Sequence, residues 1–333
     1  MSRPIRVKTP SVAAQPVDKL GRRRLGAWVA ACAAGASLTP ARAADVTGVA
    51  DLALKEVTLM RSVQWDMKLA GRLRRVWVAL PQAAPHPQGH PALFVLDGNA
   101  LFPLLSALLR LQEARPGDVR PRVPMIVALG EPSEALYDQG KRARDFSLEG
   151  PDAGGPRLLE GLAELQQAVA DRWPVDRRWL SLMGHSFSGQ FALHAALSGR
   201  SGFTRVLAAS PSIWWQERAL LQLRQRWLAG EVPGAADLRQ LVITAGALEE
   251  PGVGAALVDE RVRRQAERRQ VSRARDMAQA LQAVAGRRIR FELLPGEDHG
   301  GVLMPSARLA LEMASPAPAD STALAVPGQE ASA

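Results

Sequence analysis

The fold of this chain is decided by residues 181–197, which read SLMGHSFSGQFALHAAL. The apolar run Trp179–Met183 predicts a buried strand, and an Ala- and Leu-rich run that reads as a helix follows Ser186 almost at once. Gly184 and Ser188 put small residues two positions before and two positions after Ser186, as a sharp strand-to-helix turn requires. Glycine is the usual residue at the second of these positions, so Ser188 is a departure. We expect the turn to present the Ser186 hydroxyl as a nucleophile.

Short apolar runs on both sides of this stretch predict further buried strands separated by helices. Two runs with alternating polarity, 57–69 and 74–81, predict an antiparallel pair at the N-terminal edge of the sheet. The polar stretch Glu131–Gly155 predicts a long surface loop. The remaining predicted strands are 93–96, 124–130, 205–209, 241–245 and 289–294, and the predicted helices are 100–113, 157–172 and 258–285. This order favours an α/β fold, with a mostly parallel twisted sheet and helices on both faces.

The charge of the chain is concentrated at its N-terminus. The chain has 333 residues, 47% of them apolar, and a formal net charge of +9. Residues 1–43 contribute eight basic residues and one acidic residue, a net charge of +7, so the remainder carries only +2. A basic balance of this kind does not indicate a nucleic-acid partner for the body of the chain.

The N-terminus has the features of an export signal. The arginine cluster 22–24 precedes an apolar stretch, 25–38, and Ala41-Arg42-Ala43 is a small-residue cleavage pattern. We therefore expect an export signal over 1–43, an α/β domain over 44–313 and a disordered Ala/Pro/Ser-rich tail over 314–333. The expected location is periplasmic or secreted after cleavage near Ala43; a lipoprotein modified at Cys32 is the alternative. The export route stays open.

Cys32 is the only cysteine, so cleavage after Ala43 would leave none. Disulfides, cysteine–zinc sites and cysteine nucleophiles would then be excluded from the mature protein. Since the sequence has no metal-ligand cluster or phosphate-binding loop either, we expect no cofactor and no metal site.

A nucleophilic serine needs a base, and elimination among the five histidines predicts His299. His86 and His90 lie in a Pro-rich loop, and His194 lies within the helix that follows the turn. His185 is adjacent to Ser186 and is expected to point elsewhere. His299 remains, in a loop directly after the last predicted strand, where a hydrolase of the α/β type carries its histidine.

The orienting acid and the oxyanion donors are predicted from chain order. Glu249 and Glu250 both follow the strand 241–245, and either can orient the imidazole; a Ser–His dyad is the third possibility. The backbone N–H groups of Phe187 and Asn99 are the expected oxyanion donors. We expect the Asp97 side chain to cap its own turn.

Six motifs occur in an order that resembles a known family: FVLDGNALF, RARDFS, GHSFSGQFAL, RVLAASPSIWW, TAGALEE and GEDHGGVLMP. They resemble the α/β-superfamily hydrolases that include the periplasmic catecholate siderophore (enterobactin/salmochelin) esterases and the ferri-bacillibactin esterases. The resemblance covers residues 46–313 and implies an α/β-hydrolase fold.

Residue by residue, the resemblance implies Ser186 as nucleophile, His299 as base and Glu249 as acid. It also implies that Arg142, Trp214 and Trp215 lie near the substrate. An ion pair between Arg142 and Asp145 is the alternative for the arginine, and a place in the core is the alternative for the tryptophans.

The sequence thus predicts a serine esterase that cleaves a catecholate trilactone siderophore through an acyl-enzyme. One alternative is a carboxylesterase that acts on another acyl ester. The other is a non-catalytic siderophore-binding protein that keeps the hydrolase fold. The expected partner is a small-molecule ester, with any iron arriving as part of the substrate. We expect no nucleic acid and no membrane insertion after signal cleavage, and the sequence does not predict the oligomeric state.

Overall fold

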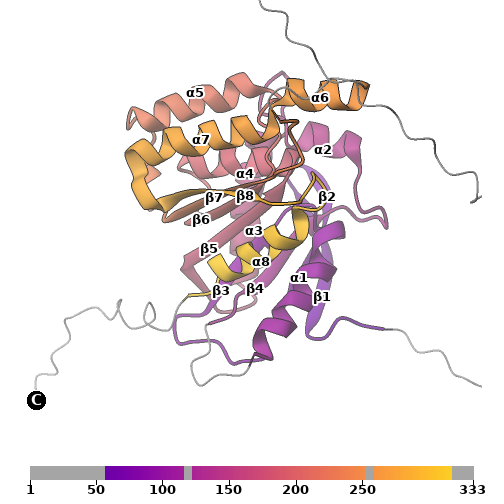
Figure 1. Cartoon of the computed structure of the whole chain (residues 1–333). Helices are drawn as coiled ribbons and strands as arrows, with labels where there is room; N and C mark the ends of the chain where they lie inside the picture. The colour runs from indigo at the N-terminus through magenta and orange to yellow at the C-terminus, as the bar shows by residue number, and fades with distance from the viewer. Residues whose placement is uncertain (1–56, 116–121, 253–258, 317–333) are drawn as a thin grey trace, which may run out of the picture. The chain divides into compact units, whose positions relative to one another are not determined.

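The computed structural model describes residues 57–115, 122–252 and 259–316, and its centre is an eight-stranded sheet of order β1-β2-β4-β3-β5-β6-β7-β8 (Figure 1). β3 to β8 pair in parallel, whereas β2 pairs antiparallel with β1 and with β4. The mostly parallel sheet with an antiparallel N-terminal edge is therefore confirmed. The strands are β1 (Ser62–Leu69), β2 (Arg72–Ala79), β3 (His90–Val95), β4 (Met125–Gly130), β5 (Val175–His185), β6 (Arg205–Ala209), β7 (Gln240–Gly246) and β8 (Ile289–Leu294).

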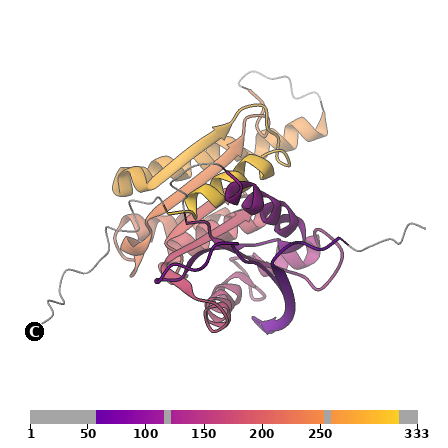
Figure 2. The ribbon, with the colours of Figure 1, turned by 90° about the horizontal axis from the view of Figure 1, so that it is seen from below.

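Helices cover both faces of this sheet and bury a separate apolar cluster on each. Along β3, Phe94 joins one cluster whereas Leu93 and Val95 join the other, because successive side chains of a strand point to opposite faces. The cluster of Leu93 is closed by α1 (Gly98–Glu113) and α8 (Leu303–Met313), which lie side by side (Figure 2). The cluster of Phe94 is closed by α3 (Gly155–Ala170), α4 (Phe187–Ser198), α5 (Glu217–Leu228) and α7 (Gln270–Ala285).

Several helices differ from the sequence prediction, which included neither α5 nor α8. The predicted helix 258–285 is interrupted, because Arg269 adopts a left-handed conformation (φ 45°) that ends α6 (Glu260–Arg268) before α7 begins. The predicted loop Glu131–Gly155 contains α2 (Gln139–Asp145). The two residues that α2 buries, Arg142 and Asp145, are both charged. Apolar periodicity therefore gave no signal for this helix.

The body of the chain extends past the predicted boundary at Met313. Ala314 is fully buried, and the Ser315 hydroxyl accepts a hydrogen bond from the Gln112 amide at 3.0 Å, so the first residues of the predicted tail are packed. The predicted signal 1–43 and the tail from 317 onward lie outside the described residues. No helix in the described ranges is long and apolar enough to cross a membrane.

Candidate active site

Ser186 occupies the turn between β5 and α4 in a backbone conformation that L-residues rarely adopt, with φ 62° and ψ −116°. The turn is so tight that a Cβ atom at Gly184 would overlap the backbone carbonyl of Ser188. A Cβ at Gly189 would lie 2.8 Å from the Ala209 carbonyl oxygen at the end of β6. The two glycines therefore permit the predicted strand-to-helix turn, which holds Ser186 between the sheet and the start of α4.

Three side chains from three different strand ends form a continuous hydrogen-bonded chain. The Nε2 atom of His299 lies 3.0 Å from the Ser186 Oγ, and its Nδ1 atom lies 2.6 Å from the Glu249 Oε2. Because an ionised carboxylate only accepts, Nδ1–H donates to Glu249 and Nε2 is left to accept the serine proton. This is the arrangement that activates a serine hydroxyl.

Glu249 is buried, with 4% of its surface exposed, and its second oxygen is also bonded. Oε1 accepts the N–H of Gly246 at 2.6 Å and the hydroxyl of Ser210. These donors compensate the burial of the carboxylate and fix its orientation.

The structure separates the two adjacent glutamates, which the residues alone left as alternatives. Glu250 accepts hydrogen bonds from the backbone N–H and the hydroxyl of Ser272, at 2.7 and 2.6 Å, in the first turn of α7. The Glu250 carboxylate therefore accepts hydrogen bonds at the start of α7, whereas the Glu249 carboxylate faces the imidazole of His299.

His185 has a role that sequence reasoning did not identify. Its side chain does not bond to Ser186; instead its Nε2–H donates to the backbone carbonyl of His299 at 2.8 Å. Burial, with a smaller contribution from nearby His299, lowers the pKa of His185 to about 4. A neutral imidazole thus fixes the loop that carries His299. The position of His185 beside the serine gave no sign of this contact, which spans 114 residues of chain.

These groups open into a cavity of about 410 Å³. Besides the three bonded side chains, its wall contains His185, Phe187, Arg142 and Trp214, together with Tyr137 from the segment before α2 and Arg268 from α6. Aromatic and cationic side chains therefore line the space next to Ser186.

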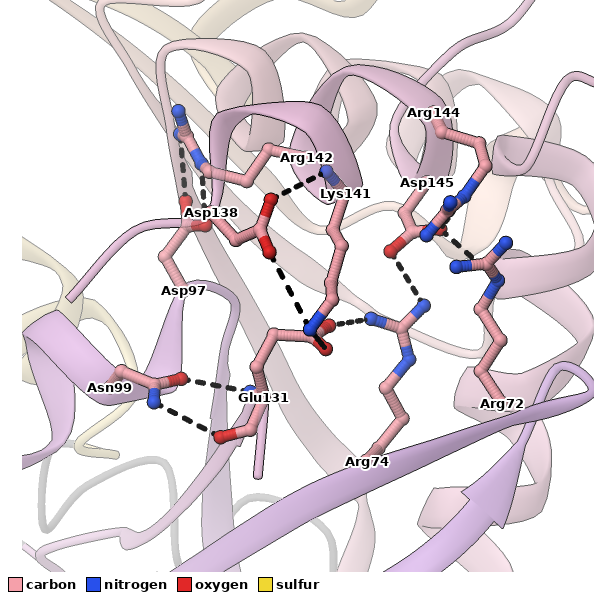
Figure 3. Close-up of polar contacts among 10 residues, drawn as sticks. All are labelled: Arg72, Arg74, Asp97, Asn99, Glu131, Asp138, Lys141, Arg142, Arg144 and Asp145. Atoms are coloured by element: carbon pink, nitrogen blue, oxygen red, sulfur yellow. Dashed lines mark hydrogen bonds and ion pairs between the residues drawn. The ribbon is translucent and has the colours of Figure 1, made fainter. Parts of the chain in front are cut away.

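The buried carboxylate of Asp97 supports the turn that carries Ser186. Asp97 accepts two hydrogen bonds from Arg142, at 2.7 Å from Nε and 3.0 Å from Nη2 (Figure 3). It also accepts the Ser188 hydroxyl at 2.6 Å, and that hydroxyl in turn accepts the N–H of His185 at 2.8 Å. The Ser188 side chain, where glycine is usual, thus links the turn to Asp97. The expectation that Asp97 caps its own turn is wrong, because its side chain makes no capping hydrogen bond.

The alternative ion pair between Arg142 and Asp145 is also wrong. Asp145 instead binds Arg74 of β2 at 2.7 Å, and Arg74 also binds Glu131, which pairs with Lys141 at 3.1 Å (Figure 3). This network fastens α2 to the sheet. Arg142 lines the cavity from α2, but its guanidinium is committed to Asp97, and its predicted contact with substrate stays a prediction.

Of the other predicted residues, some reach the cavity and some do not. Phe187 lines the cavity and is the first residue of α4, so its N–H has no acceptor within the helix. Asn99, whose backbone N–H is the other predicted oxyanion donor, is not part of the cavity wall. Its side chain is bonded to backbone groups of Glu131 and Ser133. Trp215 stacks on Phe187 at 4.2 Å between centroids and does not line the cavity, whereas Trp214 does.

Within the described ranges, no group of three or more His, Cys, Asp or Glu side chains is arranged to hold a metal ion.

Comparisons with known proteins show which family the chain resembles. The sequence profile of the Esterase family, described as "Putative esterase", matches residues 68–251. The siderophore enterobactin esterase of Emericella nidulans is 29% identical over 241 residues, which cover 65% of this chain and 78% of that protein. The siderophore triacetylfusarinine C esterase of Aspergillus fumigatus is 30% identical over 239 residues, 67% of this chain and 80% of that protein.

Among solved structures, the siderophore hydrolase EstB from Aspergillus nidulans superposes with a TM-score of 0.66 at 25% identity. The match covers 79% of this chain and 98% of that one. The fold is therefore the α/β-hydrolase fold, and the chain is similar to ester hydrolases over most of its described length.

Replacing Ser188 by alanine is expected to destabilise the protein. The Ser188→Ala change removes one donor from the buried Asp97 carboxylate and leaves the His185 N–H without its acceptor. A loss of about 1–3 kcal/mol in the free energy of unfolding follows, measurable by urea denaturation. Ser198→Ala, at the far end of the same helix, is the matched control and should cost clearly less. Equal costs for the two variants would contradict the role of Ser188.

Stability is expected to depend on the protonation of His185. The pKa of His185 is about 4 in the folded protein and 6.5 when exposed, so the unfolded chain binds more protons between these values. The free energy of unfolding should therefore fall as the pH is lowered from 6.5 through 4, by about 3 kcal/mol in total.

This contribution is isolated by comparing the denaturation of the wild type and His185→Asn across that pH range. The comparison is needed because burial also lowers the pKa of His194 to about 4. The variant should show a shallower pH dependence, and identical slopes would contradict the assignment to His185.

Proposed function

Because the chain belongs to the Esterase family, we propose that it is a serine esterase that hydrolyses the ester bonds of a siderophore, with a catecholate trilactone as the preferred substrate class. The single observation that carries the mechanism is the bonded chain from Ser186 through His299 to Glu249 at the edge of one cavity. The substrate class rests on the relatives, whose names describe siderophore esterases.

The first step of the proposed reaction is acylation of Ser186. His299 Nε2 takes the hydroxyl proton as Oγ attacks the ester carbonyl carbon, and the imidazolium that forms is stabilised by the Glu249 carboxylate. The tetrahedral intermediate collapses when the protonated Nε2 gives its proton to the leaving alkoxide. The products are a free alcohol and an acyl-enzyme ester on Ser186.

The negative charge of the tetrahedral intermediate needs fixed hydrogen-bond donors. The N–H of Phe187 is suited to this, since it is unpaired within α4 and lies at the positive end of the helix dipole. The Asn99 N–H was predicted as the second donor, but Asn99 does not line the cavity, so we do not assign it this role.

In the second half of the proposed reaction, water attacks the carbonyl carbon of the acyl-enzyme, and His299 again acts as the base.

The N-terminal segment supports a location outside the cytoplasm. We propose that residues 1–43 direct export and are removed near Ala43, so that the enzyme meets siderophore in the periplasm or outside the cell; retention as a lipoprotein at Cys32 is the alternative. The observation behind this proposal is the arginine cluster, apolar stretch and cleavage pattern in the sequence. Mass spectrometry of the exported protein would give the mature N-terminus.

Serine-dependent cleavage of a trilactone is the direct test of the proposed function. The chain from Ala44 and its Ser186→Ala variant are incubated with a triscatecholate trilactone, iron-free and iron-loaded, and chromatography follows the linear products. The wild type should linearise the trilactone, and the variant should be slower by at least about 10³-fold, because the substitution removes the hydroxyl that lies 3.0 Å from the His299 Nε2.

Hydrolysis of short p-nitrophenyl esters without trilactone cleavage would support esterase activity but would contradict a siderophore as the substrate. Inactivity toward both substrates, with siderophore still bound, would favour the binding-protein alternative. Full activity of Ser186→Ala would overturn the mechanism.

The two neighbouring glutamates provide a matched pair for testing the acid. Glu249→Gln should lower kcat by about 10²- to 10⁴-fold, because a neutral amide neither stabilises the imidazolium nor fixes its tautomer. Glu250→Gln changes charge and size equally, one residue away, and should leave kcat nearly unchanged since Glu250 is bonded to Ser272. Steady-state kinetics on one ester decides this. Equal activity of both variants would point to a Ser–His dyad.

A further inference from the structure

The charged side chains that line the cavity are not equally compensated. Arg142 is paired with Asp97, and Glu249 is paired with His299. Arg268, the third charged group with a fixed sign in the wall, has no carboxylate within ion-pair distance among the residues that the structure describes. The cavity therefore contains a positive charge that the described part of the protein does not neutralise.

Arg268 is held at the cavity by stacking. Its guanidinium carbon lies 4.5 Å from the ring centroid of Trp214, within the range of a cation–π contact. It is the last residue of α6, and the left-handed turn at Arg269 directs the chain away from the helix immediately after it. This end of α6 and the start of α2 both contribute to the cavity wall.

The tryptophan beneath Arg268 is itself fixed. The Trp214 Nε1–H donates to the Gln270 Oε1 at 3.1 Å, and the Gln270 Nε2 donates to the Pro211 carbonyl at 2.8 Å. Gln270 is 4% exposed, so this support is buried. The indole edge is thus anchored on the protein side, and Arg268 rests over an aromatic surface whose orientation is determined.

The remaining wall adds aromatic surface next to this cation. Tyr137 and Phe187 line the same cavity, and Phe187 is stacked on Trp215 behind it. A planar aromatic group gains stacking from such walls, and a negative charge on that group gains an ion pair with a guanidinium. The combination fits an aromatic ring that carries an anionic substituent.

We propose that Arg268 is a specificity-determining residue, which binds an anionic aromatic part of the ester substrate while Ser186 attacks the ester carbonyl. The proposal rests on the proposed function and adds the charge of the substrate and the residue that recognises it. Arg142 differs from Arg268 in this respect, because its charge is already matched by Asp97.

The test uses ligand binding, which does not require catalysis. Binding of 4-fluorobenzoate and of 4-fluorobenzamide, its neutral counterpart, is measured by fluorine NMR on the wild type, on Arg268→Gln and on Arg264→Gln. Arg264 lies one turn earlier on α6, pairs with Glu260 at 3.5 Å and does not line the cavity, so it controls for net charge and for helix α6.

The wild type should prefer the benzoate, and Arg268→Gln should lose about fivefold in benzoate affinity, as expected for an ion pair at an open site. Benzamide affinity should not change, and Arg264→Gln should behave as the wild type. The benzoate preference should also weaken in high salt. If Arg268→Gln folds poorly, Arg268→Lys keeps the charge and should retain part of the preference.

Equal affinity of the wild type for the two ligands, or an unchanged preference in Arg268→Gln, would overturn the proposal. Kinetics of p-nitrophenyl acetate and of the anionic mono-4-nitrophenyl glutarate separate this result from the proposed function. If the wild type hydrolyses neither ester but still prefers benzoate over benzamide, the proposed esterase function is rejected and the role of Arg268 in binding is retained. Full esterase activity with no difference between anionic and neutral compounds would reject the role of Arg268 only.

Discussion

A buried carboxylate, Asp97, joins three segments that are far apart in the sequence. Its oxygens accept from Arg142 on α2 and from Ser188 at the start of α4, and Asp97 itself follows β3. A buried charge is tolerated only when its partners are close and well oriented. The requirement to satisfy Asp97 therefore fixes α2, the turn at Ser186 and the start of α1 relative to one another.

The candidate catalytic groups depend on this frame and on the parallel order of the strands. Ser186 follows β5, Glu249 follows β7 and His299 follows β8, so all three lie at the carboxyl ends of parallel strands. In open α/β sheets such ends face one edge, and side chains from distant parts of the chain meet there. The His185 imidazole adds a direct connection from the serine turn to the backbone of His299, and its burial keeps it neutral near pH 7.

The wall of the cavity distinguishes two kinds of arginine. Arg142 is paired with the buried Asp97, which also binds Ser188, so its charge is matched and it serves the geometry of the turn. Arg268 stands on an aromatic surface at the open side and faces ligand space. Membership of an esterase family describes the type of reaction. The residues that line the cavity of each member decide which ester it accepts.

The sequence by itself determined the elements that depend on local pattern. Apolar runs located the strands, and the small residues around Ser186 predicted the turn, because local sterics and strand burial leave a clear signal. The order of Ser186, Glu249 or Glu250, and His299 along the chain also followed from the sequence.

Only the tertiary structure decided which charged groups are partners. In the folded protein Glu249 is bonded to His299, and Glu250 is bonded to Ser272. Arg142 is bonded to Asp97 and not to Asp145, and Asn99 does not line the cavity. Helix α2 was not predicted, because ion pairs rather than an apolar stripe hold it against the sheet. Hydrogen bonds and ion pairs between distant residues have no sequence period, and their partners are set by the folded backbone.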